Sequence, residues 1–167
     1  MCVICSNHFN KNIKILNLNS CSKITKIPKE CTKLEYINCL NTNITYIPNS
    51  LSNLIYLNCS NTPIKTIPST LKNLYYLNCS NTKITHIPRE LNKLKFLDCS
   101  HNNIYNIPTS FINLRELKCN HSKIFILSNN FNKLEKLNCS HCNITLLSPK
   151  YRKLISLNCS YNNIYMI

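Results

Sequence analysis

Cysteine is the residue type with the most chemical potential in this chain of 167 residues. Twelve cysteines are present. Thiolates bind soft metals and form disulfides, so a regular row of thiols raises the question of a metal or redox site. Seven of the twelve stand 20 residues apart, namely Cys39, Cys59, Cys79, Cys99, Cys119, Cys139 and Cys159.

Two Cys-x-x-Cys pairs are the strongest candidates for such chemistry. Cys2 and Cys5 are followed by His8, but no fourth metal ligand is evident nearby. Cys139 and Cys142 form the second pair. Apolar and polar residues alternate around each periodic cysteine, which predicts a short, half-buried strand with the thiol facing inward. Buried thiols stay protonated and pack as small hydrophobes, so we expect core cysteines, no redox role, no metal and no cofactor.

The 20-residue period predicts a repeat array. We number each repeat from its first apolar residue, so that Leu54 is position 1 and Cys59 position 6. Positions 1, 4, 6, 11, 14 and 18 are predicted to point inward. Proline follows position 14 in five repeats, and because it lacks an N–H the return segment cannot be an interior strand. These proline residues are Pro28, Pro48, Pro68, Pro88 and Pro108.

The pattern L-x-x-L-x-[LC]-x-x-[NTC]-x-[LI]-x-x-[LI]-P-x-x-[LF] resembles the leucine-rich repeat. That resemblance implies a solenoid, a right-handed superhelix of β/α type. Its concave face would be a parallel β-sheet, and its convex face extended or 3₁₀ segments. The bias toward Asn, Lys and Ile further resembles leucine-rich repeat proteins encoded by giant DNA viruses of amoebae.

The predicted organisation is a short N-terminal cap, residues 1–12, followed by a leucine-rich repeat domain, residues 13–167. The domain divides into eight repeats. Their bounds are 13–33, 34–53, 54–73, 74–93, 94–113, 114–133, 134–153 and 154–167.

Aromatic residues at position 3 are the first candidate binding residues. They are Tyr36, Tyr56, Tyr76 and Phe96. In a parallel sheet they would form one outward-facing column. Exposed aromatic rings are typical of binding hot spots, although stacking between strands could equally stabilise the sheet.

Two polar columns flank the aromatic residues. Position 5 carries Asn38, Asn58, Asn78 and Asp98, whose amides either contact a partner or bond to one another. Position 8 carries His101, His121 and His141, which could form a pH-sensitive surface. Parallel imidazoles from in-register strands fit tetrahedral zinc poorly, so we predict no metal there.

The net charge of +14 permits anionic partners, but the basic residues mostly fall outside the predicted sheet face. We therefore predict a non-catalytic module that binds a protein of unknown identity on its concave face. Nucleic-acid or other polyanion binding through the basic convex surface is the alternative.

The chain lacks glycine and shows no catalytic constellation, which argues against an enzyme. With no apolar run of 18 residues and no signal peptide, we expect no membrane span and a cytoplasmic location, in the host cell if the protein is viral.

Overall fold

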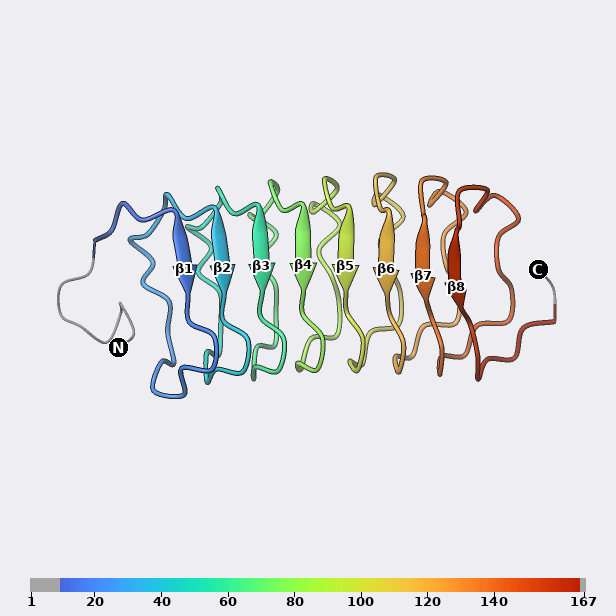
Figure 1. The fold of residues 1–167 in the computed structure, drawn as a ribbon, viewed down its shortest axis with the longest axis horizontal. Coiled ribbons are helices and arrows are strands. Elements are labelled where there is room, and N and C mark those ends of the chain that lie inside the picture. Colours follow the sequence, from blue (N-terminus) through green and yellow to red (C-terminus); the bar gives the residue numbers. More distant parts are fainter. Residues whose placement is uncertain (1–9, 166–167) are drawn as a thin grey trace.

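The structure is a computed structural model that describes residues 10–165. Each predicted repeat contributes one three-residue strand, and the strands lie side by side in chain order in one parallel sheet (Figure 1). The Cys2, Cys5 and His8 cluster and most of the predicted cap lie outside the described residues. The strands are Ile15–Asn17 (β1), Tyr36–Asn38 (β2), Tyr56–Asn58 (β3), Tyr76–Asn78 (β4), Phe96–Asp98 (β5), Glu116–Lys118 (β6), Lys136–Asn138 (β7) and Ser156–Asn158 (β8).

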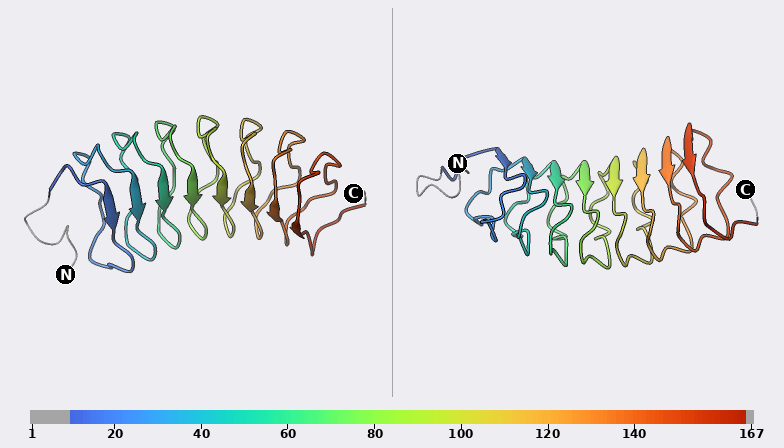
Figure 2. Two further views of the ribbon diagram at one scale, coloured as in Figure 1. Left: turned by 45° about the horizontal axis from the view of Figure 1, so that its top comes forward. Right: turned by 60° about the horizontal axis from the view of Figure 1, so that its bottom comes forward.

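The sheet pairs equivalent repeat positions without a slip. Tyr56 lies opposite Tyr36 and Tyr76, and Leu57 lies opposite Ile37 and Leu77. Each strand contacts only its neighbours in sequence. The solenoid is gently curved, with the sheet on the inner side of the curve (Figure 2). The parallel sheet and the solenoid predicted from the repeat pattern are thus confirmed.

The core consists of inward columns of apolar side chains. Leu54, Leu57, Cys59 and Ile64 of one repeat are completely buried, and the equivalent residues of the neighbouring repeats pack above and below them. Full burial of a Leu or Ile side chain contributes roughly 1.5–3 kcal/mol, so stability comes from repeat-to-repeat packing. At the final strand this cover is missing within the described residues: Leu157 is 41% exposed, whereas Leu137 is 2% exposed.

The convex segments contain turns, and no helix occurs anywhere in residues 10–165. The N–H of Leu51 donates to the Pro48 carbonyl at 3.2 Å, and the N–H of Leu54 donates to the Leu51 carbonyl at 3.1 Å. These are single turns of 3₁₀-like geometry. Where serine replaces the proline, its hydroxyl accepts an N–H two residues on, as Ser148 does from Lys150 at 3.2 Å. The extended or 3₁₀ path predicted for this side is therefore confirmed.

Every repeat turns a corner at position 8 with a positive φ, between 51° and 58°. This left-handed conformation ordinarily favours glycine, which the chain lacks, and among other residues it is tolerated best by Asn, Asp and His. Asn and His indeed occupy six of the eight corners. The eight residues are Ser20, Asn41, Asn61, Asn81, His101, His121, His141 and Tyr161.

Position 9 follows the corner and points inward. The hydroxyl of Thr62 donates to the Cys59 carbonyl at 2.6 Å. The amide nitrogen of Asn102 donates to the Cys79, Cys99 and Ser100 carbonyls at 2.8–3.2 Å. These buried side chains satisfy carbonyl groups that the corner leaves without a backbone partner.

Candidate functional site

The outward surface of the sheet carries the residues predicted to bind a partner. We call this surface the sheet face; it comprises positions 3 and 5 of the strands together with the position 8 corners. Positions 3 and 5 flank the buried central residue of each strand, as the burial pattern of Tyr56–Asn58 shows. The columns form because in-register parallel strands place equivalent side chains next to one another.

The aromatic residues of position 3 form a continuous stack across β2–β5. The ring centroids of Tyr36 and Tyr56, of Tyr56 and Tyr76, and of Tyr76 and Phe96 are each 4.2 Å apart, with interplanar angles of 3–10°. The flat ring faces are therefore covered by one another, and each ring is only half-buried. A partner would meet the ring edges and the tyrosine hydroxyls. The stabilising role that the sequence left open is thus present in the structure, alongside the exposed edges.

The tyrosine hydroxyls of this stack stay protonated at neutral pH. Burial raises the pKa of Tyr56 and of Tyr76 above the ordinary value of a phenol. Each hydroxyl therefore offers both a donor and an acceptor, without carrying charge, to whatever contacts the stack.

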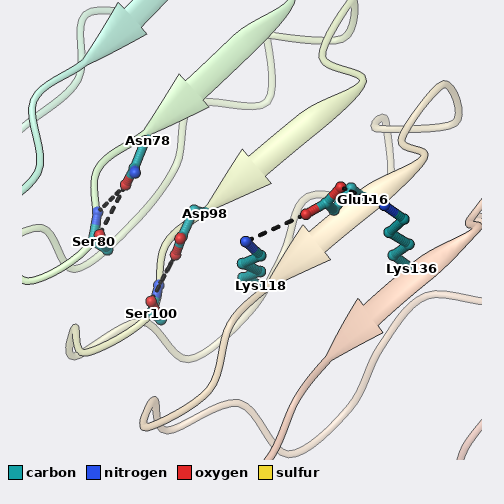
Figure 3. Close-up of polar contacts among 7 residues, drawn as sticks. All are labelled: Asn78, Ser80, Asp98, Ser100, Glu116, Lys118 and Lys136. Atoms are coloured by element: carbon teal, nitrogen blue, oxygen red, sulfur yellow. Dashed lines mark hydrogen bonds and ion pairs between the residues drawn. The ribbon is translucent and has the colours of Figure 1, made fainter. Parts of the chain in front are cut away.

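The side chains at position 5 accept hydrogen bonds within the turn that follows each strand. The side-chain oxygen of Asn78 accepts hydrogen bonds from the N–H and the hydroxyl of Ser80, at 3.0 Å and 2.8 Å. Asp98 does the same with Ser100 at 3.1 Å and 2.6 Å, as Figure 3 shows. Asn58 repeats the pattern with Ser60, and Asn38 accepts from the N–H of Leu40. These Asx turns lead each strand into its corner.

Of the two roles considered for the position 5 amides, bonding to one another is not found among the described residues; their oxygens accept bonds within the turn instead. The amide ladder lies instead at position 8. The amide nitrogen of Asn61 donates to the side-chain oxygen of Asn41 at 2.8 Å, and Asn81 donates to Asn61 at the same distance.

Histidine rings continue this corner column. The ring centroids of His101 and His121 are 4.4 Å apart, and those of His121 and His141 are 4.2 Å apart; Tyr161 stacks on His141 at 4.1 Å. Nearly parallel rings do not converge on a common point, which tetrahedral zinc requires. Within residues 10–165, no group of three or more His, Cys, Asp or Glu side chains could hold a metal ion.

A cluster of charges replaces the aromatic stack from β6 onward. A carboxylate oxygen of Glu116 lies 3.4 Å from the Lys118 ammonium, and its other oxygen lies 3.9 Å from that of Lys136 (Figure 3). The Lys118 nitrogen also lies 5.6 Å from the centroid of the Phe96 ring, which ends the stack. These three charged residues were not among the predicted site residues. The sequence feature that could have identified them is the change at position 3 from aromatic to charged residues.

The periodic cysteines are part of the core. Burial raises the pKa of the Cys39 thiol to about 12, and it also raises the pKa of the Cys59 thiol well above the ordinary value of a thiol. Cys142, from the second Cys-x-x-Cys pair, is buried at position 9, where its sulfur donates to the Cys119 carbonyl at 3.2 Å. Cys142 therefore occupies the position that Asn102 fills two repeats earlier, where the Asn102 amide likewise donates to a backbone carbonyl of the preceding repeat, that of Cys79.

The repeats match the family model described as Leucine Rich Repeat at residues 53–74, 73–94, 93–114 and 133–151. A solved leucine-rich repeat protein of Leptospira interrogans is similar over 91% of this chain and 44% of its own, with 27% identity and a TM-score of 0.80. The functional domain of InlJ from Listeria monocytogenes, which includes a cysteine ladder, is similar over 93% of this chain and 41% of its own, with 26% identity and a TM-score of 0.74.

Internalin C2 from Listeria monocytogenes shares the fold, with 24% identity and a TM-score of 0.83 over 91% of this chain and 73% of its own. No curated protein sequence matches the chain. The chain spans less than half the length of the first two solved structures. Together with the repeat matches, these likenesses show that the chain folds as a leucine-rich repeat solenoid.

Proposed function

We propose that this leucine-rich repeat solenoid is a non-catalytic module that binds a protein partner on its sheet face. Leucine-rich repeat folds generally mediate protein–protein interaction. The observation that carries the proposal is the stack of Tyr36, Tyr56, Tyr76 and Phe96 on the outside of the sheet. Only the middle residue of each of these strands belongs to the core, so the fold leaves position 3 free for another purpose.

The stack suits binding because it is ordered before a partner arrives. Tyrosine combines apolar ring area with a hydroxyl, and it loses little side-chain entropy when it is already held by its neighbours. The charge cluster of Glu116, Lys118 and Lys136 adds polar contacts further along the same surface. A partner that spans both regions would meet an aromatic part and a charged part in a fixed order.

The non-catalytic part of the proposal is supported by the state of the reactive groups. The tyrosine hydroxyls have raised pKa values, and the Cys59 thiol is buried with a raised pKa. Hydrogen bonding lowers the pKa of the Cys142 thiol to about 6, but Cys142 is only 6% exposed, so a substrate has little access to its sulfur.

The test is a paired substitution on the sheet face. Tyr56→Ala with Tyr76→Ala should weaken binding of the protein partner recovered from host extract by about tenfold or more, since central aromatic residues dominate interface energies. The matched control is Tyr46→Ala with Tyr105→Ala, which removes two exposed tyrosines away from the sheet face. Affinity measured by surface plasmon resonance should fall only in the first variant. Equal affinities in a folded Tyr56/Tyr76 variant would disprove the sheet-face proposal.

The second candidate function is binding of nucleic acid or another polyanion through the basic convex surface. The net charge of +14 and the exposure of Lys26, Lys29 and Lys65 favour it. Counterion release would make such binding fall steeply with salt. Binding of a random oligonucleotide that persists near 150 mM salt would support this function, and binding lost at that salt would make it incidental.

A cytoplasmic location belongs to the same proposal, with the host cytoplasm as the compartment if the protein is viral. Free thiols among the described cysteines support a reducing compartment. Among residues 10–165, no helix is long and apolar enough to cross a bilayer. Alkylation of the denatured protein taken directly from cells should modify all twelve cysteines, whereas an oxidising compartment would protect some of them.

A further inference from the structure

A groove of about 550 Å³ runs along the rim of the solenoid, beside the residues that lead into β1–β4. It lies between two columns, position 2 and the residue that precedes position 1. Ile55 and Tyr75 form its apolar part and are 46% and 44% exposed. We call it the rim groove; its residues are Lys14, Lys33, Glu35, Asn53, Ile55, Asn73, Tyr75 and Lys93.

Positive charge around the rim groove is only partly compensated. Lys14 and Glu35 form an ion pair at 2.8 Å. The Lys93 ammonium donates to the uncharged side chain of Asn73 at 2.8 Å, and Lys95 lies 4.5 Å above the centroid of the Tyr75 ring. Lys33, Lys93 and Lys95 belong to none of the ion pairs in the described part of the chain. Three uncompensated cations therefore surround an exposed apolar surface.

The same columns differ in the later repeats. Arg115 and Glu135 occupy position 2 there and form an ion pair at 2.6 Å. Lys133 donates to Asn113 as Lys93 does to Asn73, but its neighbourhood contains this neutralising pair. The N-terminal part of the rim differs in that two exposed apolar residues, Ile55 and Tyr75, are adjacent in the position 2 column, whereas the later repeats have only Ile155 as an apolar residue at that position.

The spacing of the cations defines the length of a ligand. Lys33 and Lys93 are three repeats apart, which is about 14 Å at roughly 4.8 Å per strand. An extended peptide covers that span with about four residues at roughly 3.3 Å each. Between the two lysines, the side-chain oxygen of Asn53 accepts no hydrogen bond from the described residues, so it can accept one from a peptide N–H.

We propose that the rim groove binds an extended acidic segment of a protein. Two carboxylates about four residues apart would pair with Lys33 and Lys93, and an aliphatic or aromatic side chain between them would lie on Ile55 and Tyr75. Nucleic acid fits less well, because it requires several aromatic platforms and the groove has one, with Lys95 over one face. The rim groove lies outside positions 3, 5 and 8, so its peptide binding can be tested independently of the sheet-face proposal.

The probe is a fluorescein-labelled peptide with the core Glu-Leu-Leu-Leu-Glu, which places its two carboxylates four residues apart, and fluorescence anisotropy measures its affinity for the full chain. The Lys33→Glu/Lys93→Glu variant should weaken binding by about tenfold or more, a change of about 1.4 kcal/mol. The matched control, Lys26→Glu/Lys65→Glu, changes the net charge equally at exposed residues outside the rim groove and should weaken binding less than about threefold. Circular dichroism spectra that match the parent protein verify that both variants fold.

Two further peptides test the chemistry of the ligand. A Gln-Leu-Leu-Leu-Gln core should bind at least tenfold more weakly, and a Glu-Ser-Ser-Ser-Glu core should lose the contribution of Ile55 and Tyr75. The proposal is overturned by equal losses in the two lysine variants, by no binding of the Glu-Leu-Leu-Leu-Glu peptide at 1 mM, or by an oligonucleotide that displaces it and binds more tightly. If the Lys33→Glu/Lys93→Glu variant does not fold, Tyr75→Ser replaces it; it should weaken binding of the leucine-core peptide and leave binding of the serine-core peptide unchanged, and equal losses for the two peptides would overturn the proposal.

Discussion

The two halves of the sheet face differ in how neighbouring side chains hold one another, while the core beneath them is the same. In β2–β5, tyrosine and phenylalanine rings stack at 4.2 Å and the corner asparagines bond through their amides. In β6 and β7, Glu116 bridges two lysines, and the corners carry stacked histidines. Beneath both halves, Leu77 and Leu117 are completely buried at the same position.

This difference shows what the repeat fixes and what it leaves free. A solenoid repeat must fill its inward positions identically, because each one packs on the next. Its outward positions need only be compatible with the neighbour in the same column. One chain can therefore present an aromatic region and a charged region without any change in backbone geometry.

The largest expected effect tests whether the core is truly shared. Leu77→Ala and Leu117→Ala should each cost about 2–5 kcal/mol, since both remove a completely buried side chain. The two costs should agree within about 1 kcal/mol, because neighbouring repeats pack alike on both. Urea unfolding followed by circular dichroism measures them. A much smaller cost in one half would mean that the halves are packed differently.

The next effect concerns the two stacks. Tyr56→Ala removes two ring contacts and should cost about 1–3 kcal/mol, at roughly 0.5–1.5 kcal/mol per aromatic pair. His121→Asn also removes two ring contacts, but its imidazole is exposed and asparagine tolerates the positive φ of the corner. Its cost should stay below about 1 kcal/mol. Equal costs in urea unfolding would contradict the distinction between a half-buried stack and an exposed one.

Alkaline pH should destabilise both halves alike. Burial raises the pKa of the Cys39 and Cys139 thiols to about 12 in the folded state, against an ordinary value of 9.0. Above pH 9 the unfolded chain loses these protons while the folded chain keeps them, so stability falls as pH rises toward 12. Each thiol contributes a slope of up to about 1.4 kcal/mol per pH unit.

Cys39→Val and Cys139→Val should reduce this slope by similar amounts. Urea unfolding at pH 8, 9 and 10 under a reducing, oxygen-free atmosphere measures it. A pH dependence unchanged from the parent protein in either variant would show that the thiol in question is not protected by burial.

The smallest effect lies in the charge cluster. Glu116→Gln removes a partly exposed bridge between Lys118 and Lys136 and should change stability by less than about 1 kcal/mol, an effect that added salt screens. Asp98→Asn is the control, because asparagine keeps the oxygen that accepts from Ser100. Thermal unfolding at low and high salt compares the two. A loss of several kcal/mol for Glu116→Gln would mean that the cluster supports the fold.

The repeat period predicted the fold in detail. One strand per repeat and the inward cysteines both follow from alternation and spacing, as Cys59 illustrates. Such features depend on side-chain type and period alone, which a sequence displays directly.

The polar columns were harder to predict because their roles depend on backbone geometry. The bond between Asn78 and Ser80 requires an Asx turn that begins at position 5, and nothing in the residue types separates it from an amide ladder. The positive φ of His101 explains why a corner residue can be histidine instead of glycine. The rim groove was missed because the sequence places Lys93 on the return side, while the turn brings it beside Tyr75.

The chain order of the strands has a mechanical consequence. Because each strand contacts only its sequence neighbours, a force that pulls the two ends apart loads the strand pairs in series. Each 20-residue unit that detaches would release roughly 70 Å of contour length, at about 3.5 Å per residue. Rupture would proceed in equal steps, because the strand pairs are joined in the same parallel register. Under tension, the molecule would therefore behave as an extensible tether of uniform links.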